Sequence, residues 1–96
     1  MFAWDTQKAI VNFMKHGVSF EEAATIFSDP DGLDWEDVTH STQEKRYKRL
    51  GESTEGKILI VVYTVRRLTD AKETIRLISA RRASRKERKA YSRQSD

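Results

Sequence analysis

The segment from Lys57 to Val65, KILIVVYTV, constrains the fold more than any other part of the chain. Its β-branched and apolar residues follow one another almost without interruption, and these are the residue types that strands favour. A strand that is half exposed would instead alternate apolar with polar residues. We therefore expect a central strand that is covered on both faces.

Weaker strand signals lie on either side of this segment. Residues 44–50 alternate well enough for a strand, and residues 73–80 contain Ile75, Leu77 and Ile78 among residues that favour strands. The segment 51–56 reads as a turn, and 66–72 as the link between two strands. Leu33 and Trp35 fit a short strand, and Phe2 and Trp4 fit either an edge strand or an apolar anchor.

Two helices are expected before the sheet. Asp5 is a good N-cap for the first, and Gly17 fits the left-handed position that ends it. The pair Ser19 and Glu22 forms a capping box for the second. The apolar stripes are Ala9, Ile10, Phe13 and Met14 in the first helix, and Phe20, Ala23, Ala24 and Phe27 in the second.

A third helix follows an abrupt change of character at Ala80. Arg81 and Arg82 stand at the end of a strand, and Ser84 with Glu87 forms another capping box. Basic residues fill the first turns of this helix, where they oppose the helix dipole. Because this placement of cations is unfavourable for the helix, it indicates that they contact a polyanion. The alternative is a basic face that is only solvated. The helical cations are Arg85, Lys86, Arg88 and Lys89.

These elements predict one α+β domain over residues 1–96, with a disordered tail at about 92–96. Two N-terminal helices pack on a three- to four-stranded antiparallel sheet, and the basic helix closes the fold. Charge is divided along the chain. Residues 1–44 hold two Lys and nine Asp or Glu, whereas residues 45–96 hold sixteen Lys or Arg and six acids. This asymmetry predicts a basic working surface on the second half.

Composition and motifs narrow the chemistry. The chain has no cysteine, which excludes disulfides and thiolate metal sites and favours a reducing cytoplasm. No apolar run is long enough to span a membrane, and the N-terminus has no secretory signal. His16 and His40 lack the spacing of a metal pair. We therefore expect neither a metal nor another cofactor.

RNA cleavage remains open to such a chain, because a 2′-hydroxyl can attack its neighbouring phosphate if a base, an acid and phosphate-binding cations are present. Arg81 and Arg82 are the best phosphate ligands, and Arg49 and Arg66 reach the same predicted surface. Each candidate proton donor or acceptor also has a structural explanation, such as packing or solvation. These candidates are His16, His40, Glu44, Lys8 and Tyr91.

Several segments together resemble the BrnT family of toxins from type II toxin–antitoxin pairs. They cover nearly the whole chain in the family's order, and the block around residues 15–23 and the block around 78–91 are the most specific. The matching segments are WDTQKA at 4–9, KHGVSFEEA at 15–23, the acidic stretch ending in His40, VVYT at 61–64 and IRLISARRASRKERKAY at 75–91.

The resemblance implies a RelE-like fold and an RNA-cleaving toxin that inhibits translation. It also implies a BrnA-type antitoxin with a ribbon–helix–helix domain, a heterotetramer of two toxins and two antitoxins, and repression of the pair's own promoter. His16, Arg81, Arg82 and Tyr91 occupy matching positions. Their roles stay open, because the family lacks the archetypal RelE catalytic set. The alternative function is a non-catalytic module that binds RNA or the ribosome.

Overall fold

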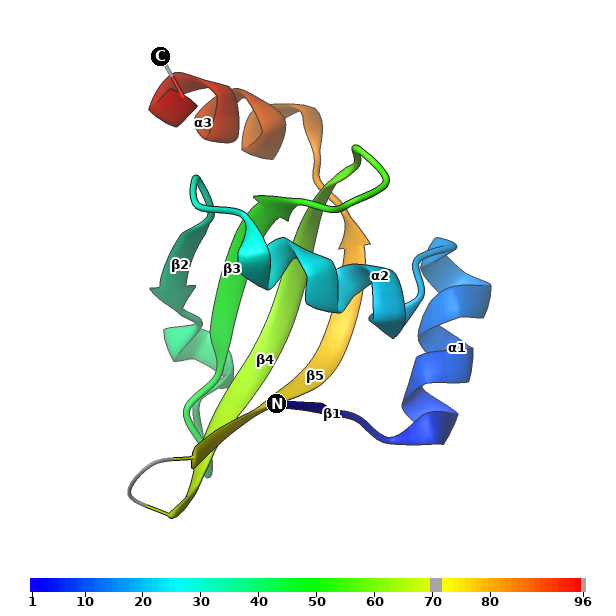
Figure 1. Cartoon of the computed structure of the whole chain (residues 1–96), viewed down its shortest axis with the longest axis vertical. Coiled ribbons are helices and arrows are strands. Elements are labelled where there is room, and N and C mark those ends of the chain that lie inside the picture. The colour runs from blue at the N-terminus through cyan, green and yellow to red at the C-terminus, as the bar shows by residue number, and fades with distance from the viewer. Residues whose placement is uncertain (70–71, 96) are drawn as a thin grey trace.

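The computed structural model describes residues 1–69 and 72–95. Over these residues it is an α+β fold with three α-helices, two short 3₁₀ turns and one five-stranded sheet (Figure 1). The elements are β1 (Phe2–Ala3), α1 (Thr6–His16), α2 (Phe20–Thr25), η1 (Ile26–Ser28), β2 (Leu33–Glu36), η2 (Val38–His40), β3 (Tyr47–Glu52), β4 (Ile58–Thr69), β5 (Lys72–Arg82) and α3 (Arg85–Ser95).

The sheet has the order β1-β5-β4-β3-β2, with β4 in its centre. Neighbouring strands run antiparallel except β1, which pairs with β5 in parallel. The predicted antiparallel sheet of three or four strands is therefore wrong in number and in kind. Of the two interpretations of Phe2 and Trp4, the edge strand is the one observed, and its parallel pairing with β5 is what the sequence pattern does not reveal.

The helix starts and the end of α1 are those that the sequence predicts, whereas α2 ends at Thr25, before Phe27 of its predicted stripe. The Asp5 side chain accepts a hydrogen bond from the backbone N–H of Lys8, and Gly17 ends α1 with a φ of 70°. The Ser19 hydroxyl accepts from the backbone N–H of Glu22. Helix α3 continues to Ser95, through residues for which the sequence predicts a disordered tail, and Asp96 lies outside the described residues.

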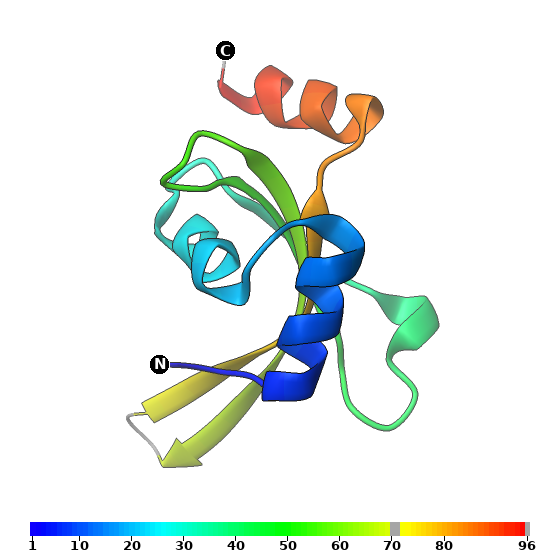
Figure 2. The ribbon, with the colours of Figure 1, turned by 90° about the vertical axis from the view of Figure 1, so that its right-hand side faces the viewer.

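The main core lies between α2 and one face of the sheet. Phe20, Ala23 and Ile26 are fully buried there against strand residues that include Leu59 and Val61. Figure 2 shows α2 on this side of the sheet and the η2 segment on the other. Burial of these apolar side chains supplies most of the driving force for the fold.

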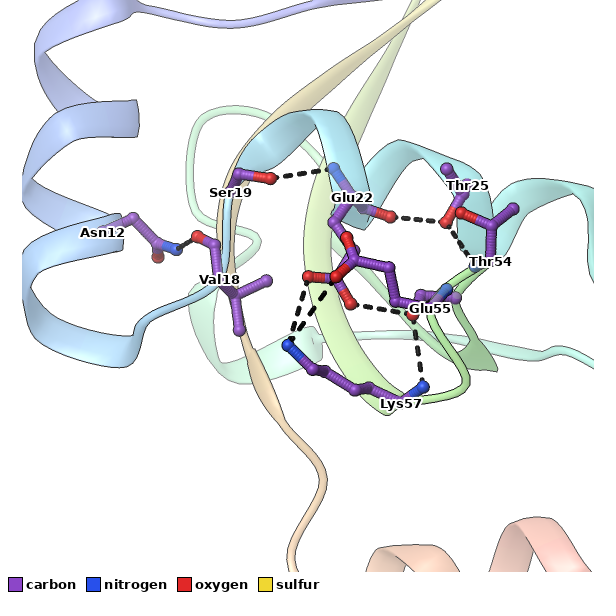
Figure 3. A network of polar contacts seen from close by, with 9 residues as sticks. Asn12, Val18, Ser19, Glu22, Thr25, Thr54, Glu55 and Lys57 are labelled. Carbon is purple, nitrogen blue, oxygen red and sulfur yellow. Dashed lines mark hydrogen bonds and ion pairs between the residues drawn. The ribbon is translucent and has the colours of Figure 1, made fainter.

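The polar side of α2 is fastened to the turn between β3 and β4 (Figure 3). The buried carboxylate of Glu22 accepts a hydrogen bond from the Ser53 hydroxyl at 2.8 Å and lies 3.8 Å from the Lys57 ammonium. Thr25 accepts a hydrogen bond from the backbone N–H of Thr54. The Glu22 carboxylate therefore joins α2 to this turn, and only the Ser19 half of the predicted capping box is formed.

Helix α1 lies beside the exposed edge of β5, not on the sheet (Figure 1). Within it, the Asn12 amide donates to the Ala80 carbonyl at 2.8 Å and accepts from the Ala80 N–H at 3.0 Å, as a neighbouring strand would. Most of the predicted apolar stripe is consequently not buried. Ile10, Phe13 and Met14 are 51 %, 55 % and 81 % exposed.

The second face of the sheet is covered differently. Helix α3 crosses only one end of it, where Leu50, Ile60, Ala83 and Tyr91 form a small core. Among the described residues, no α-helix lies over the remainder of this face. Ile60 and Thr64, which point to it, are nevertheless buried, so the prediction of a strand covered on both faces is confirmed for residues 58–64 and does not extend to the exposed end of β4.

Candidate nucleic-acid interface

The face opposite α2 collects basic side chains from three strands; we call it the basic face. Leu59, Val61 and Tyr63 point into the α2-side core, so the alternate residues of β4, which include Arg66, point to the other face. Residues paired directly with these also point there. The strand cations of the basic face are therefore Lys48, Arg66, Arg76 and Arg81.

Arg81 is held in a fixed orientation at the end of β5. Its Nη1 and Nη2 donate to the two carboxylate oxygens of Glu87 at 2.8 and 3.0 Å, and Nη1 also donates to the Arg82 carbonyl. Glu87 in turn is fixed by the capping box, because its carboxylate accepts from the Ser84 N–H at 2.7 Å. The predicted box is thus confirmed, and it orients a guanidinium.

The ion pair shifts both pKa values. The hydrogen bond from Arg81 is the main cause that lowers the pKa of Glu87 to about 2, and the same bond raises the pKa of Arg81. Both groups therefore stay charged throughout the physiological range. Three of the five guanidinium hydrogens are used in these contacts. Among the described residues, Nε–H and the second Nη2 hydrogen of Arg81 have no acceptor.

Two predicted acid–base residues lie on the segment that projects from the basic-face side of the sheet (Figure 2). His40 is 64 % exposed, and its Nδ1 lies 2.9 Å from an Asp37 oxygen. The Glu44 carboxylate lies 3.6 Å from Nε of Arg66. This segment therefore brings His40 and Glu44 to the same side as the strand cations.

Helix α1 adds further cations at the β5 edge. Lys8, Lys15 and His16 line one cavity with Ile78 and Ser79 of β5. A second cavity, of about 430 Å³, includes Arg66 and Arg76 of the strands and Trp4. Lys15, Lys48 and Arg76 are not among the binding residues predicted from the sequence. Only the strand register, which the sequence does not reveal, brings Lys48 and Arg76 onto this face.

Arg49, a predicted RNA ligand, lies on the α2 side. Its Nε donates to the Ile26 carbonyl at 3.0 Å, one Nη donates to the Asp29 carbonyl at 2.7 Å, and the other pairs with Asp34. The guanidinium also lies over the Phe27 ring. Each of its nitrogens thus binds a protein acceptor, and its side chain is only 13 % exposed.

Tyr91 is buried and joins α3 to the turn after η1. Its hydroxyl donates to Asp29 at 2.5 Å, and burial together with this bond raises its pKa. Burial alone would raise the pKa of Asp29, but hydrogen bonds from Tyr91, Glu52 and Asp31 outweigh it and lower the pKa. This geometry matches the packing role that was the alternative to a catalytic role: Tyr91 packs the last helix on the sheet.

The remaining predicted cations are exposed around the junction between β5 and α3. Arg82 lies at the end of β5, and Arg88 donates to the Ala83 carbonyl at 2.9 Å. The others extend along the exposed surface of α3. They are Arg85, Lys86 and Lys89.

The described part of the chain contains no group of three His, Cys, Asp or Glu residues that could hold a metal ion. None of its helices has the length and apolar character needed to cross a membrane.

Taken together, a small α+β domain with a basic sheet face defines a class of protein able to bind a polyanion. Comparison with known proteins gives the family. Residues 4–87 match the family model described as "Ribonuclease toxin, BrnT, of type II toxin-antitoxin system", and the chain belongs to this family. The resemblance inferred from the sequence is thereby confirmed.

A solved structure supports the same fold. The chain is similar to the ribonuclease toxin BrnT of Brucella abortus, whose crystal structure was determined at 1.1 Å resolution. The TM-score is 0.62 at 23% sequence identity, over 88% of this chain and 99% of that one. A search of curated protein sequences found no match.

Proposed function

We propose that the protein is a metal-independent endoribonuclease that binds single-stranded RNA on the basic face and cleaves it at Arg81. The observation that carries this proposal is the free edge of the Arg81 guanidinium, held in place by Glu87. Two parallel N–H donors on a planar group match two oxygens of one phosphate. Family membership supports the ribonuclease activity.

The proposed reaction needs no added reagent. The 2′-oxygen bonds to the adjacent phosphorus as its proton passes to a base, and the bond from phosphorus to the 5′-oxygen breaks as an acid protonates that oxygen. The products are a 2′,3′-cyclic phosphate and a 5′-hydroxyl. Arg81 stabilises the charge on the phosphate oxygens. His16, His40 and Glu44 are the candidate acid and base.

We further propose that a BrnA-type antitoxin neutralises the toxin by covering Arg81, Arg82 and α3. This surface is exposed and basic, so an acidic segment of a partner can compete with RNA for it. The proposal includes a heterotetramer in the cytoplasm and contact with operator DNA only through the antitoxin. Charge reversal at Arg85 and Arg88 should weaken the binding of both RNA and antitoxin.

The test is incubation of the purified chain with RNA in EDTA, followed by analysis of the cleaved ends. We expect 2′,3′-cyclic ends, and a rate about 10²–10³-fold lower for Arg81→Ala. Arg81→Lys should recover only part of the rate, because an ammonium lacks the two-point grip. Lys72→Ala, at the far end of β5, is the control and should cleave normally.

Two results would contradict the proposal. Full cleavage by Arg81→Ala would remove the arginine from the reaction. RNA binding without cleavage by the unmodified chain would support the alternative, a non-catalytic module that inhibits translation by occupancy.

A further inference from the structure

A cavity of about 320 Å³ lies between α1 and β5, on the basic-face side of the β5 edge. From its chemistry we infer that it is a subsite for one nucleotide of the bound RNA, next to the phosphate held by Arg81. This inference rests on the proposed function. The lining residues are Gln7, Lys8, Val11, Asn12, Lys15, His16, Ile78 and Ser79.

The position of the cavity fits a neighbouring nucleotide. Ser79 pairs with Val62 and Arg81 pairs with Ile60, so both β5 side chains point to the basic face. Two residues along a strand span roughly 7 Å. An RNA strand whose phosphate lies at Arg81 therefore passes the mouth of this cavity.

The floor of the cavity is apolar although it is open to solvent. Val11 is 59 % exposed, and Ile78 is half-buried at the register shift between β4 and β5. No other described element packs against the exposed surface of Val11. An unstacked base has an apolar face of the kind that fits such a floor, as proteins that read single-stranded RNA commonly exploit.

Polar groups at the cavity can read the edge of a base. The Gln7 amide offers both a donor and an acceptor, and the Ser79 hydroxyl can serve as either. Neither side chain has a hydrogen bond to another of the described residues. In contrast, Asn12 is committed to Ala80 and Val18 and acts only as a wall. Gln7 and Ser79 are therefore the proposed specificity-determining residues.

The cations of the cavity suit the phosphates on either side of that base. Lys8 and Lys15 lie seven residues apart on α1, which corresponds to roughly 10.5 Å along the helix. Both are exposed, and His16 lies beside Lys15. An acidic peptide would also be attracted to these cations, but it would leave the apolar floor and the Gln7 amide without a matching group.

The first experiment maps cleavage sites on a mixed RNA pool by sequencing. Gln7→Ala and Ser79→Ala should change which base is preferred beside the cut, while the total rate falls less than about threefold. Thr6→Ala, one position along α1, should keep the original preference. An unchanged preference in both cavity variants, with cleavage intact, overturns the subsite and leaves the proposed function standing.

The second experiment measures the affinity of the full chain for 2′-O-methyl RNA, which cannot be cleaved. Lys8→Ala and Lys15→Ala should each weaken binding and make the salt dependence of log K shallower by about 0.7, whereas Lys72→Ala should not. This experiment decides the subsite even if the chain proves unable to cleave RNA. The subsite would be overturned if Lys8→Ala, Lys15→Ala and Lys72→Ala weakened RNA binding equally. It would also be overturned if the Lys8 and Lys15 variants weakened the binding of an acidic peptide but not of RNA.

Discussion

Both faces of the sheet carry arginines and carboxylates, yet the two faces use them differently. On the α2 side, the guanidinium nitrogens of Arg49 bind the Asp34 carboxylate and two backbone carbonyls. The Tyr63 hydroxyl donates to the same Asp34 carboxylate at 2.7 Å. On the basic face, Arg81 binds one carboxylate and keeps one edge open. The difference teaches that charge alone does not mark a binding surface. Donors without a protein acceptor do.

The largest expected effect contrasts Arg49 with Arg66. Arg49→Ala removes the partner of a carboxylate and two carbonyls, so we expect the free energy of unfolding to fall by about 3 kcal/mol. Arg66→Ala, on the basic face, should change it by about 0.5 kcal/mol or less and weaken RNA binding. Urea denaturation and RNA titration of both variants measure these effects. If Arg66→Ala proved the more destabilising, the distinction between the faces would be wrong.

The second effect concerns the edge where the two faces meet. Asn12→Ala leaves the Ala80 N–H and carbonyl without the amide that pairs with them, at a cost of about 2 kcal/mol. Gln7→Ala, five residues earlier on the same helix, should cost about 0.5 kcal/mol or less. Thermal denaturation compares them. Equal stabilities would show that α1 is held at the β5 edge by other contacts.

How well the sequence predicts a feature of this fold depends on how far apart along the chain the interacting residues lie. Caps at Asp5, Ser19 and Ser84 act within three residues, and all three are confirmed. The strand pattern at residues 57–65 is also local in the sequence, and β4 contains nearly all of these residues. Local patterns therefore predict the elements well.

The errors concern relations between distant residues. The apolar stripe of α1 predicts burial, but the helix is positioned by Asn12 and Ala80, which are 68 residues apart. Arg49 and Arg66 read alike in the sequence, and only the sheet register places them on opposite faces. The Arg81 and Arg82 junction was predicted, whereas its pairing with Glu87 was not.

A third, smaller effect is expected on the basic face itself. Thr64 is fully buried, and its hydroxyl is the buried side-chain polar atom that lacks a hydrogen-bond partner among the described residues. Thr64→Val keeps the shape and removes this unpaired group, so stability should rise by about 1 kcal/mol. Calorimetry checks the gain. A loss would mean that the hydroxyl has a partner in solution, such as a bound water.

The smallest effect tests whether the Arg81–Glu87 pair serves the fold or the site. The pKa of Glu87 falls from its usual 4.5 to about 2 on folding, because Arg81 donates to its carboxylate. A carboxyl with a lowered pKa stabilises the fold above pH 4.5, and this contribution disappears as the pH falls from 4.5 to about 2.

The pair is partly exposed, so Glu87→Gln should cost only about 0.5 kcal/mol at pH 7, and less below pH 4.5. In the Arg81→Ala background the pH-dependent effect of the same substitution should be smaller, because only the hydrogen bonds with Ser84 then lower the pKa of Glu87. Cleavage should respond more strongly than stability, because a guanidinium that is no longer oriented loses its two-point grip on the phosphate. A Glu87→Gln variant that cleaves RNA at the full rate would show that the pair only joins α3 to β5, and that Arg81 finds its phosphate without help from the capping box.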